Sequence, residues 1–146
     1  MTAEMRREET FEAIRRSVEE EPHSRNLGIR LVDLRPGWAV AEMEFSGEME
    51  SIFGTAHGGA IFSLIDEAFG AAANSHGTVA VALNVNVTYV SQPSPGETLR
   101  AVAVEVDRSE RTSTCKIRVL GEDGRLIAST QATGYRKKER LPFLDF

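Results

Sequence analysis

The sequence contains a single cysteine, Cys115, among 146 residues. An internal disulfide is therefore excluded, and cysteine by itself provides no framework for a metal ion. A surplus of basic residues is also missing, because 17 Lys and Arg stand against 22 Asp and Glu and give a net charge of −5. This balance argues against a general nucleic-acid-binding protein.

Long hydrophobic runs are absent as well. The most apolar stretch, residues 59–73, is too short and too interrupted for a transmembrane helix. The charged segment 1–21 has no apolar core of the kind found in signal peptides. With 41% apolar and 27% charged residues, the composition is that of an ordinary globular protein. We therefore expect one domain over residues 1–146, located in the cytoplasm.

Two segments have the pattern of helices. Residues 4–21 place apolar side chains at helical spacing among many charges, which predicts an amphipathic surface helix that Pro22 ends. The segment from Gly54 to Asn74 is almost entirely apolar and contains the second predicted helix. A helix of this composition is expected in the centre of the fold.

The remaining patterns predict β-strands. Two apolar segments, 29–34 and 38–45, flank an Arg-Pro-Gly turn signal and are expected to form a hairpin. Four more strands are predicted after Gly77, at residues 79–90, 99–106, 112–120 and 126–135. The basic and then apolar segment 136–146 is expected to be a flexible tail. The predicted fold class is α+β, with an antiparallel sheet wrapped around one long hydrophobic helix.

Three polar side chains interrupt the central helix before Asn74, namely Ser63, Asp66 and Glu67. Their spacing of i, i+3 and i+4 puts them on one face. An ionised carboxylate in a core costs several kcal/mol unless it is paired or used. This face is therefore either an exposed strip or the lining of a site.

The distance between Gly58 and Asp66 suggests that such a site is shared. Eight residues of helix separate them, which corresponds to roughly 12 Å. Two groups that act on one carbonyl must both come within about 3 Å of it. Two antiparallel copies of the helix, packed across a two-fold axis, would bring Gly58 of one chain near Asp66 of the other.

Three motifs together resemble a known family: GTAHGG at 54–59, SLID at 63–66 and NVNVTY at 84–89. Their order and spacing are similar to those of the hotdog-fold acyl-coenzyme A thioesterases, in the phenylacetate-degradation (PaaI-like) branch of the 4HBT family. The likeness covers roughly residues 26–135. It implies a hotdog fold with a short additional N-terminal helix.

The resemblance also implies roles for individual residues. Asp66 matches the catalytic carboxylate, which acts as a general base or a nucleophile toward the thioester. Gly58 matches the backbone N–H that polarises the thioester carbonyl, and His57 matches a residue that frames this carbonyl. In the family these groups come from opposite subunits. Coenzyme A is part of the substrate, and neither a cofactor nor a metal is implied.

Further residues are candidates for substrate binding. Ser51 occupies a position where family members usually carry Asn, and its shorter side chain has a different reach. The other candidates are Phe53, Gly59, Phe62, Ser63 and Asn84. An acyl tunnel is expected between the helix and a partner's sheet, lined by Phe53, Phe62 and Phe69. Basic side chains that could hold the phosphates of coenzyme A are Arg108, Arg111 and Lys116.

Structural interpretations stand beside these roles. His57 is expected to hydrogen-bond the backbone at the helix start, and Ser63 to bond back to the carbonyl at i−4. Asp66 without the motif would be an ordinary exposed carboxylate. Glu67 is expected to be salt-bridged or solvated, because it points about 100° away from Asp66 on the helix. Cys115 is expected to be a small buried side chain.

The sequence thus predicts an acyl-CoA thioesterase that hydrolyses an aryl- or medium-chain acyl-CoA to the free acid and coenzyme A. We expect a homodimer or a dimer of dimers, with no nucleic-acid or membrane partner. An alternative is a hotdog acyl-thioester hydratase or dehydratase, in which a His and a carboxylate converge on the substrate. A non-catalytic acyl-CoA sensor and a purely structural dimer are also compatible with the sequence.

Overall fold

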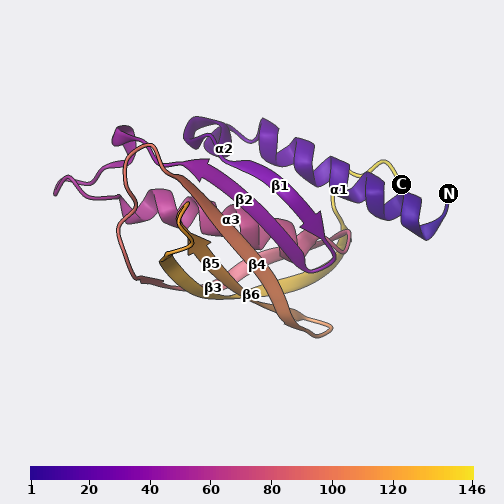
Figure 1. Cartoon of the computed structure of the whole chain (residues 1–146). Helices are drawn as coiled ribbons and strands as arrows, with labels where there is room; N and C mark the ends of the chain where they lie inside the picture. Colours follow the sequence, from indigo (N-terminus) through magenta and orange to yellow (C-terminus); the bar gives the residue numbers. More distant parts are fainter.

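In the computed structural model, which describes residues 1–146, six antiparallel strands form one sheet that curves around helix α3 (Figure 1). The helices are α1 (Ala3–Glu20), α2 (Pro22–Leu27) and α3 (Gly58–Asn74), with a 3₁₀ turn at Gly47–Met49. The strands are β1 (Arg30–Arg35), β2 (Trp38–Glu44), β3 (Thr78–Tyr89), β4 (Thr98–Arg108), β5 (Thr112–Leu120) and β6 (Leu126–Arg140). Their order in the sheet is β1-β2-β4-β5-β6-β3. This arrangement confirms the predicted α+β class.

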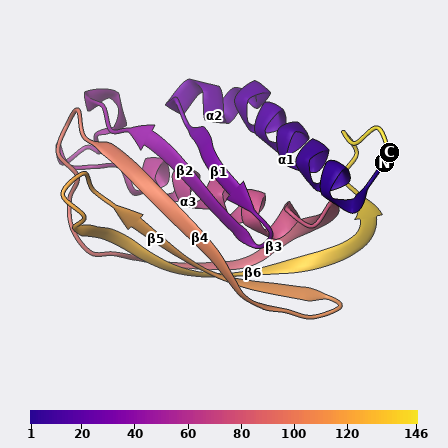
Figure 2. The same cartoon turned by 45° about the vertical axis from the view of Figure 1, so that its right-hand side comes forward.

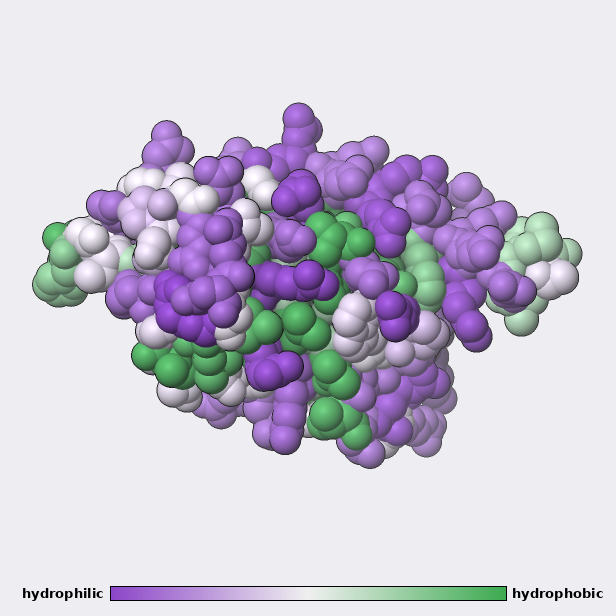
Figure 3. Space-filling view, viewed as in Figure 1, coloured by the Kyte–Doolittle hydropathy of each residue, from purple (hydrophilic) through white to green (hydrophobic).

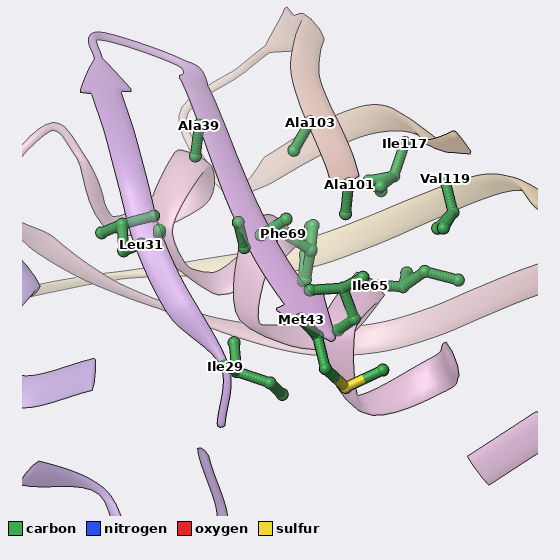
Figure 4. Packing of buried hydrophobic residues seen from close by; sticks show 14 of the residues in the cluster. Ile29, Leu31, Ala39, Met43, Ile65, Phe69, Ala101, Ala103, Ile117 and Val119 are labelled. Atoms are coloured by element: carbon green, nitrogen blue, oxygen red, sulfur yellow. The ribbon is translucent and has the colours of Figure 1, made fainter. Parts of the chain in front are cut away.

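The core lies between α3 and the inner face of the sheet. Figure 4 shows apolar side chains of α3, among them Ile65 and Phe69, packed among those of the strands. Fully buried alanines on β2 and β4 leave room for the helix, namely Ala39, Ala41, Ala101 and Ala103. A Cβ atom on Gly134 of β6 would lie 3.1 Å from Cζ of Phe69. Small strand residues therefore let α3 approach the sheet closely.

The N-terminal prediction is confirmed in part. Helix α1 buries Ile14 and Val18 on one face, as its pattern predicts. Pro22 does end α1, but it is also the first residue of α2, a helix that the sequence pattern did not predict. Proline is favoured at a first helical position, and Gly28, with φ of 69°, closes the short helix.

The predicted hairpin and the four later strands are confirmed, but β6 is longer than predicted. It runs to Arg140, where it pairs with Thr78 at the start of β3. Leu141 is buried, and its N–H donates to the carbonyl of Gly77. The prediction of a flexible tail from residue 136 was therefore wrong for residues 136–141. The charged sequence there shows no apolar alternation, and only the presence of β3 beside it makes it a strand.

Two surfaces remain uncovered on the single chain. Strand β3 forms one edge of the sheet, and Val81 and Leu83 are exposed along it. Figure 3 shows apolar side chains near the middle of the face seen in Figure 1. Val32 of β1 and Val104 and Val106 of β4 are exposed. None of the three helices combines the length and the hydropathy that a membrane span requires.

Candidate active site

The start of α3 forms the first part of the site. His57 is the N-cap residue, and its Nδ1 accepts a hydrogen bond of 2.9 Å from the N–H of Gly59. The expected backbone contact of His57 is thus confirmed, and it leaves Nε2 as the ring nitrogen that carries the proton. The N–H of Gly58 has no acceptor within the chain. It lies at the positive end of the helix dipole and is available to a developing negative charge.

Tyr89, the last residue of β3, also contacts the start of α3. The Tyr89 hydroxyl donates to the carbonyl of Gly58 at 2.9 Å. A Cβ atom on Gly58 would lie 3.1 Å from the ring and the hydroxyl of Tyr89. Glycine is therefore required here by the close approach of a side chain. In the sequence Tyr89 stands out only as the end of the NVNVTY motif, and no local signal predicts this contact.

One turn into α3, Ser63 links the helix to α2. Its hydroxyl donates to the carbonyl of Gly59 at 2.9 Å, which confirms the expected bond to position i−4. The same oxygen lies 2.9 Å from Nε2 of His23 and accepts from it when that nitrogen carries the proton. His23 is thus a residue of the site that sequence reasoning missed. The sequence signal that could have indicated its position is Pro22 followed by Gly28, which begin and end the short helix α2. This helix brings His23 against α3.

Asp66 lies on the exposed side of α3, one turn beyond Ser63. Neighbouring side chains still remove part of its hydration, and this desolvation is the main reason that the pKa of Asp66 is raised. The negative charge of Glu21 raises this pKa further, whereas His23 lowers it. Two residues from the junction of α1 and α2 thus tune the carboxyl in opposite directions.

Glu67 was predicted to be salt-bridged or solvated, and the structure differs from this prediction. It takes part in no ion pair, and it faces a cavity of about 230 Å³ between α1 and α3 together with Glu21. Burial raises the pKa of Glu67 to about 8, and a hydrogen bond with the Glu21 carboxyl raises it as well. The Glu67 carboxyl therefore holds a proton at neutral pH. The position of α1 across this cavity from α3, which the sequence pattern did not reveal, is the physical reason.

The loop before α3 carries two other predicted residues. Ser51 builds the loop: its hydroxyl lies 3.1 Å from that of Thr55 and accepts from the N–H of Phe53 at 3.2 Å. Phe53 stands at the tip and is 82% exposed. An aromatic side chain with so little contact to its own chain is available to a ligand or to a second chain.

The remaining predicted substrate residues fall into two groups. Phe62 is partly exposed on the same side of α3 as Asp66, where a substrate can reach it. Phe69 was predicted to line the tunnel, but it is only 2% exposed and belongs to the core. Asn84 lies beside Asn86 on the outer face of the sheet, away from α3. The structure of the single chain therefore brings neither Phe69 nor Asn84 to the helix start.

The three basic residues suggested for coenzyme A do not converge. Arg108 at the end of β4 lines a cavity with other arginines. Arg111 donates to the hydroxyl of Tyr135, in a separate depression beside Arg136. Lys116 lies on the outer face of the sheet. Cys115 is fully buried, and burial raises its pKa to about 11, which confirms it as a structural side chain.

Within one chain, the two candidate groups of the site lie far apart on α3. Gly58 and Asp66 stand two turns apart on α3, or roughly 12 Å, too far to act on the same carbonyl. A free N–H at the helix start suits an oxyanion, and a carboxylate with a raised pKa suits proton abstraction from water. No group of three or more His, Cys, Asp or Glu side chains is placed to hold a metal ion.

Comparisons with known proteins agree with this geometry. A family model described as "Thioesterase superfamily" matches residues 53–128, which include the helix start and Asp66. The Escherichia coli acyl-coenzyme A thioesterase PaaI is 30% identical over 110 residues, 75% of this chain and 79% of that protein. Its solved structure covers 91% of this chain and 96% of its own with a TM-score of 0.86 and 26% identity.

Two other solved structures extend the likeness. A variant of the phenylacetic acid degradation protein PaaI from Thermus thermophilus is 38% identical, with a TM-score of 0.76, over 80% of this chain and 100% of that one. The smu.793 protein of Streptococcus mutans, bound to acetyl CoA, is 25% identical with a TM-score of 0.74 over 77% of this chain and 91% of that one.

Proposed function

The chain belongs to the thioesterase superfamily as a PaaI-like thioester hydrolase of the hotdog fold, and we propose that it hydrolyses an aryl- or medium-chain acyl-CoA to the free acid and coenzyme A. The observation that carries the proposal is the combination of a free Gly58 N–H at the start of α3 with a carboxyl of raised pKa at Asp66. The acetyl CoA bound to the Streptococcus mutans protein supports the choice of coenzyme A esters.

In the proposed mechanism, the Gly58 N–H donates to the thioester oxygen as negative charge develops on it. Asp66 either takes a proton from an attacking water or attacks the carbonyl carbon itself. In the first route, the water oxygen bonds to that carbon, its proton goes to Asp66, and the C–S bond breaks. The thiolate of coenzyme A then leaves and takes up a proton. In the second route, an Asp66 oxygen bonds to that carbon, the C–S bond breaks with release of the thiolate, and water then hydrolyses the mixed anhydride to the free acid and Asp66.

The two groups are supplied by different subunits of a homodimer in this proposal. The exposed edge of β3 offers unpaired backbone groups and the apolar side chains of Val81 and Leu83 to a second copy. Pairing of two β3 edges in antiparallel fashion sets the two α3 helices side by side, so that Gly58 of one approaches Asp66 of the other. The exposed side chains of Val32, Val104 and Val106 are then the contact for a dimer of dimers.

The acyl group is proposed to lie between α3 of one chain and the sheet of its partner. Phe62 on the exposed side of α3 lines one wall. Phe53 at the tip of the loop before α3 is exposed and free to contact the second chain or the acyl group. Ser51 shapes this loop rather than contacting the thioester, because its hydroxyl is engaged within the loop.

The hydratase alternative is less favourable, because a histidine and a carboxylate must converge on one substrate. His57 uses Nδ1 to cap α3, which fixes its ring at the helix start. A sensor or structural protein has no need for a carboxyl of raised pKa on the same helix as a free N–H. Both of these remain outcomes of the activity test.

The test is thiol release from a panel of aryl- and aliphatic-CoA esters, with wild type beside Asp66→Asn. We expect kcat to fall by about a hundredfold or more, because a positioned general base contributes at least that much. The matched control is Asp107→Asn, which removes the same charge from the exposed end of β4 and should retain activity. Binding without hydrolysis by wild type would favour the sensor, and equal activity of Asp66→Asn would overturn the assignment of Asp66.

A further inference from the structure

A cavity of about 420 Å³ at the far end of the molecule from the start of α3 is lined by basic side chains. They are Arg6 and Arg7 of α1, His76 after α3, Arg108 at the end of β4 and Arg140 at the end of β6. No residue that lines this cavity has a carboxylate side chain. Figure 2 shows that the start of α1, the end of β6 and the C-terminus lie together at this end.

The four arginines of the cavity have no partner in the chain. The five ion pairs of the structure involve other basic residues. The arginines that donate side-chain hydrogen bonds are Arg111, Arg125 and Arg136. Four guanidinium groups around one cavity repel each other, although the chain as a whole has a net charge of −5. A bound anion would relieve this repulsion.

Glu105, which contacts His76 of the lining, does not neutralise the arginines. Glu105 is largely buried, and its Oε1 lies 2.8 Å from Nε2 of His76. Its Oε2 accepts a hydrogen bond of 2.5 Å from the Ser113 hydroxyl. Both oxygens are therefore engaged. Glu105 orients the imidazole at the wall of the cavity and leaves the arginines to an external ligand.

The chemistry of the lining indicates the class of ligand. Arginine binds phosphate oxygens through two parallel N–H bonds, and several arginines together suit more than one phosphate group. Leu144 and the ring of Phe146 add an apolar wall. The volume lies within the range of about 300–1,000 Å³ that is usual for small-ligand sites. We propose that this cavity binds a nucleotide that carries two or more phosphate groups.

The proposed cavity is separate from the groups that cleave the thioester. It begins at Ser75, past the end of α3, and Asp66 lies about 13–14 Å back along the helix. The same chemistry fits two sources, namely the nucleotide end of a coenzyme A substrate and a free nucleotide. Binding to the cavity does not require that the chain hydrolyse any thioester, so the site stands independently of the proposed function.

The direct test is calorimetric titration of the full chain with ADP and with inorganic diphosphate. The variant Arg6→Gln/Arg140→Gln should weaken ADP binding by at least about tenfold, because charge-assisted hydrogen bonds are lost. The control Arg30→Gln/Arg100→Gln removes the same charge from two exposed positions outside the cavity and should change binding by less than about twofold. Absence of ADP binding to wild type, or an equal loss in both variants, would overturn the proposal.

A second measurement distinguishes the two sources. A CoA thioester and a pantetheine thioester with the same acyl group are compared on wild type and on Arg6→Gln/Arg140→Gln. A higher KM for the CoA ester alone identifies the substrate's nucleotide end as the ligand. An unchanged KM for both esters, with ADP binding lost, identifies a free nucleotide. An equal rise in KM for both esters contradicts the proposal, because the pantetheine ester has no nucleotide.

Discussion

The hydroxyl of Tyr89 donates to the carbonyl of Gly58 at 2.9 Å, and so ties the edge strand β3 to the first residue of α3. The carbonyl and the free N–H of Gly58 belong to adjacent peptide groups. Tyr89 thereby fixes the direction in which the proposed oxyanion donor points. The end of the NVNVTY motif is thus joined to the HGG motif by a direct contact.

We expect Tyr89→Phe to lower kcat by roughly two- to tenfold with little change in KM, since one neutral hydrogen bond contributes about 0.5–1.5 kcal/mol. The ring is retained, so the packing around Gly58 should be unaffected. Steady-state kinetics and a thermal melt measure the two effects. An unchanged kcat would mean that the bond does not position the N–H.

Mixing two inactive variants tests whether the site is shared. Asp66→Asn removes the carboxylate, and Gly58→Pro removes the N–H at a position where helices accept proline. If the groups come from different subunits, random mixing should restore about a quarter of wild-type activity, because half of the dimers carry one intact site. A melt must show that Gly58→Pro is folded, because its Cβ approaches Tyr89. No recovery from folded partners would place the whole site in one chain.

Substitutions at Glu21 and His23 should move the pH profile of kcat in opposite directions. In the proposed mechanism Asp66 acts as a carboxylate, so activity should be lost as the pH falls through its pKa. The positive charge of His23 lowers the pKa of Asp66 and the charge of Glu21 raises it. His23→Gln should therefore shift the acidic limb to higher pH, and Glu21→Gln should shift it to lower pH. Shifts of the same sign in both variants would contradict this electrostatic account.

Glu67 should make the fold less stable as the pH rises. Its pKa is raised from 4.5 to about 8 in the folded chain, so between these values the folded state holds a proton that the unfolded state releases. Its stability contribution is therefore lost progressively from about pH 4.5 upward and levels off above pH 8. Glu67→Gln should raise Tm at pH 8.5 by at least about 3 °C, and by less at pH 5. The control Glu44→Gln, at an exposed position, should show no such difference between the two pH values.

Substitutions at two phenylalanines should affect stability and substrate binding separately. Phe69 is buried in the core, so Phe69→Ala should lower the free energy of unfolding by about 3–5 kcal/mol. Phe53 is exposed, so Phe53→Ala should change it by less than about 0.5 kcal/mol, while it raises KM for aryl-CoA esters. Denaturant melts and kinetics on both variants give the comparison. A KM for Phe53→Ala equal to that of wild type would remove this residue from the acyl site.

Much of the fold was predictable because it depends on local patterns. The apolar run of α3, the turn at Pro36-Gly37 and the alternation in β3 each fix an element within a few residues. The resemblance of the HGG motif and Asp66 to the hotdog-fold thioesterases also identified the candidate catalytic groups, and the 1.5 Å rise per residue set the distance between them. These properties follow from the sequence by itself.

Other features depend on contacts between distant segments. His23 meets Ser63 across 40 positions of sequence, and Glu21 meets Glu67 at a cavity that residues of α1 and α3 line together. The extension of β6 to Arg140 likewise requires β3 as a partner. No local periodicity contains this information, because burial and charge at these residues are created by the neighbour and not by the residue itself. The sequence thus determined the elements and the catalytic candidates, and only the tertiary structure decided which charges surround them.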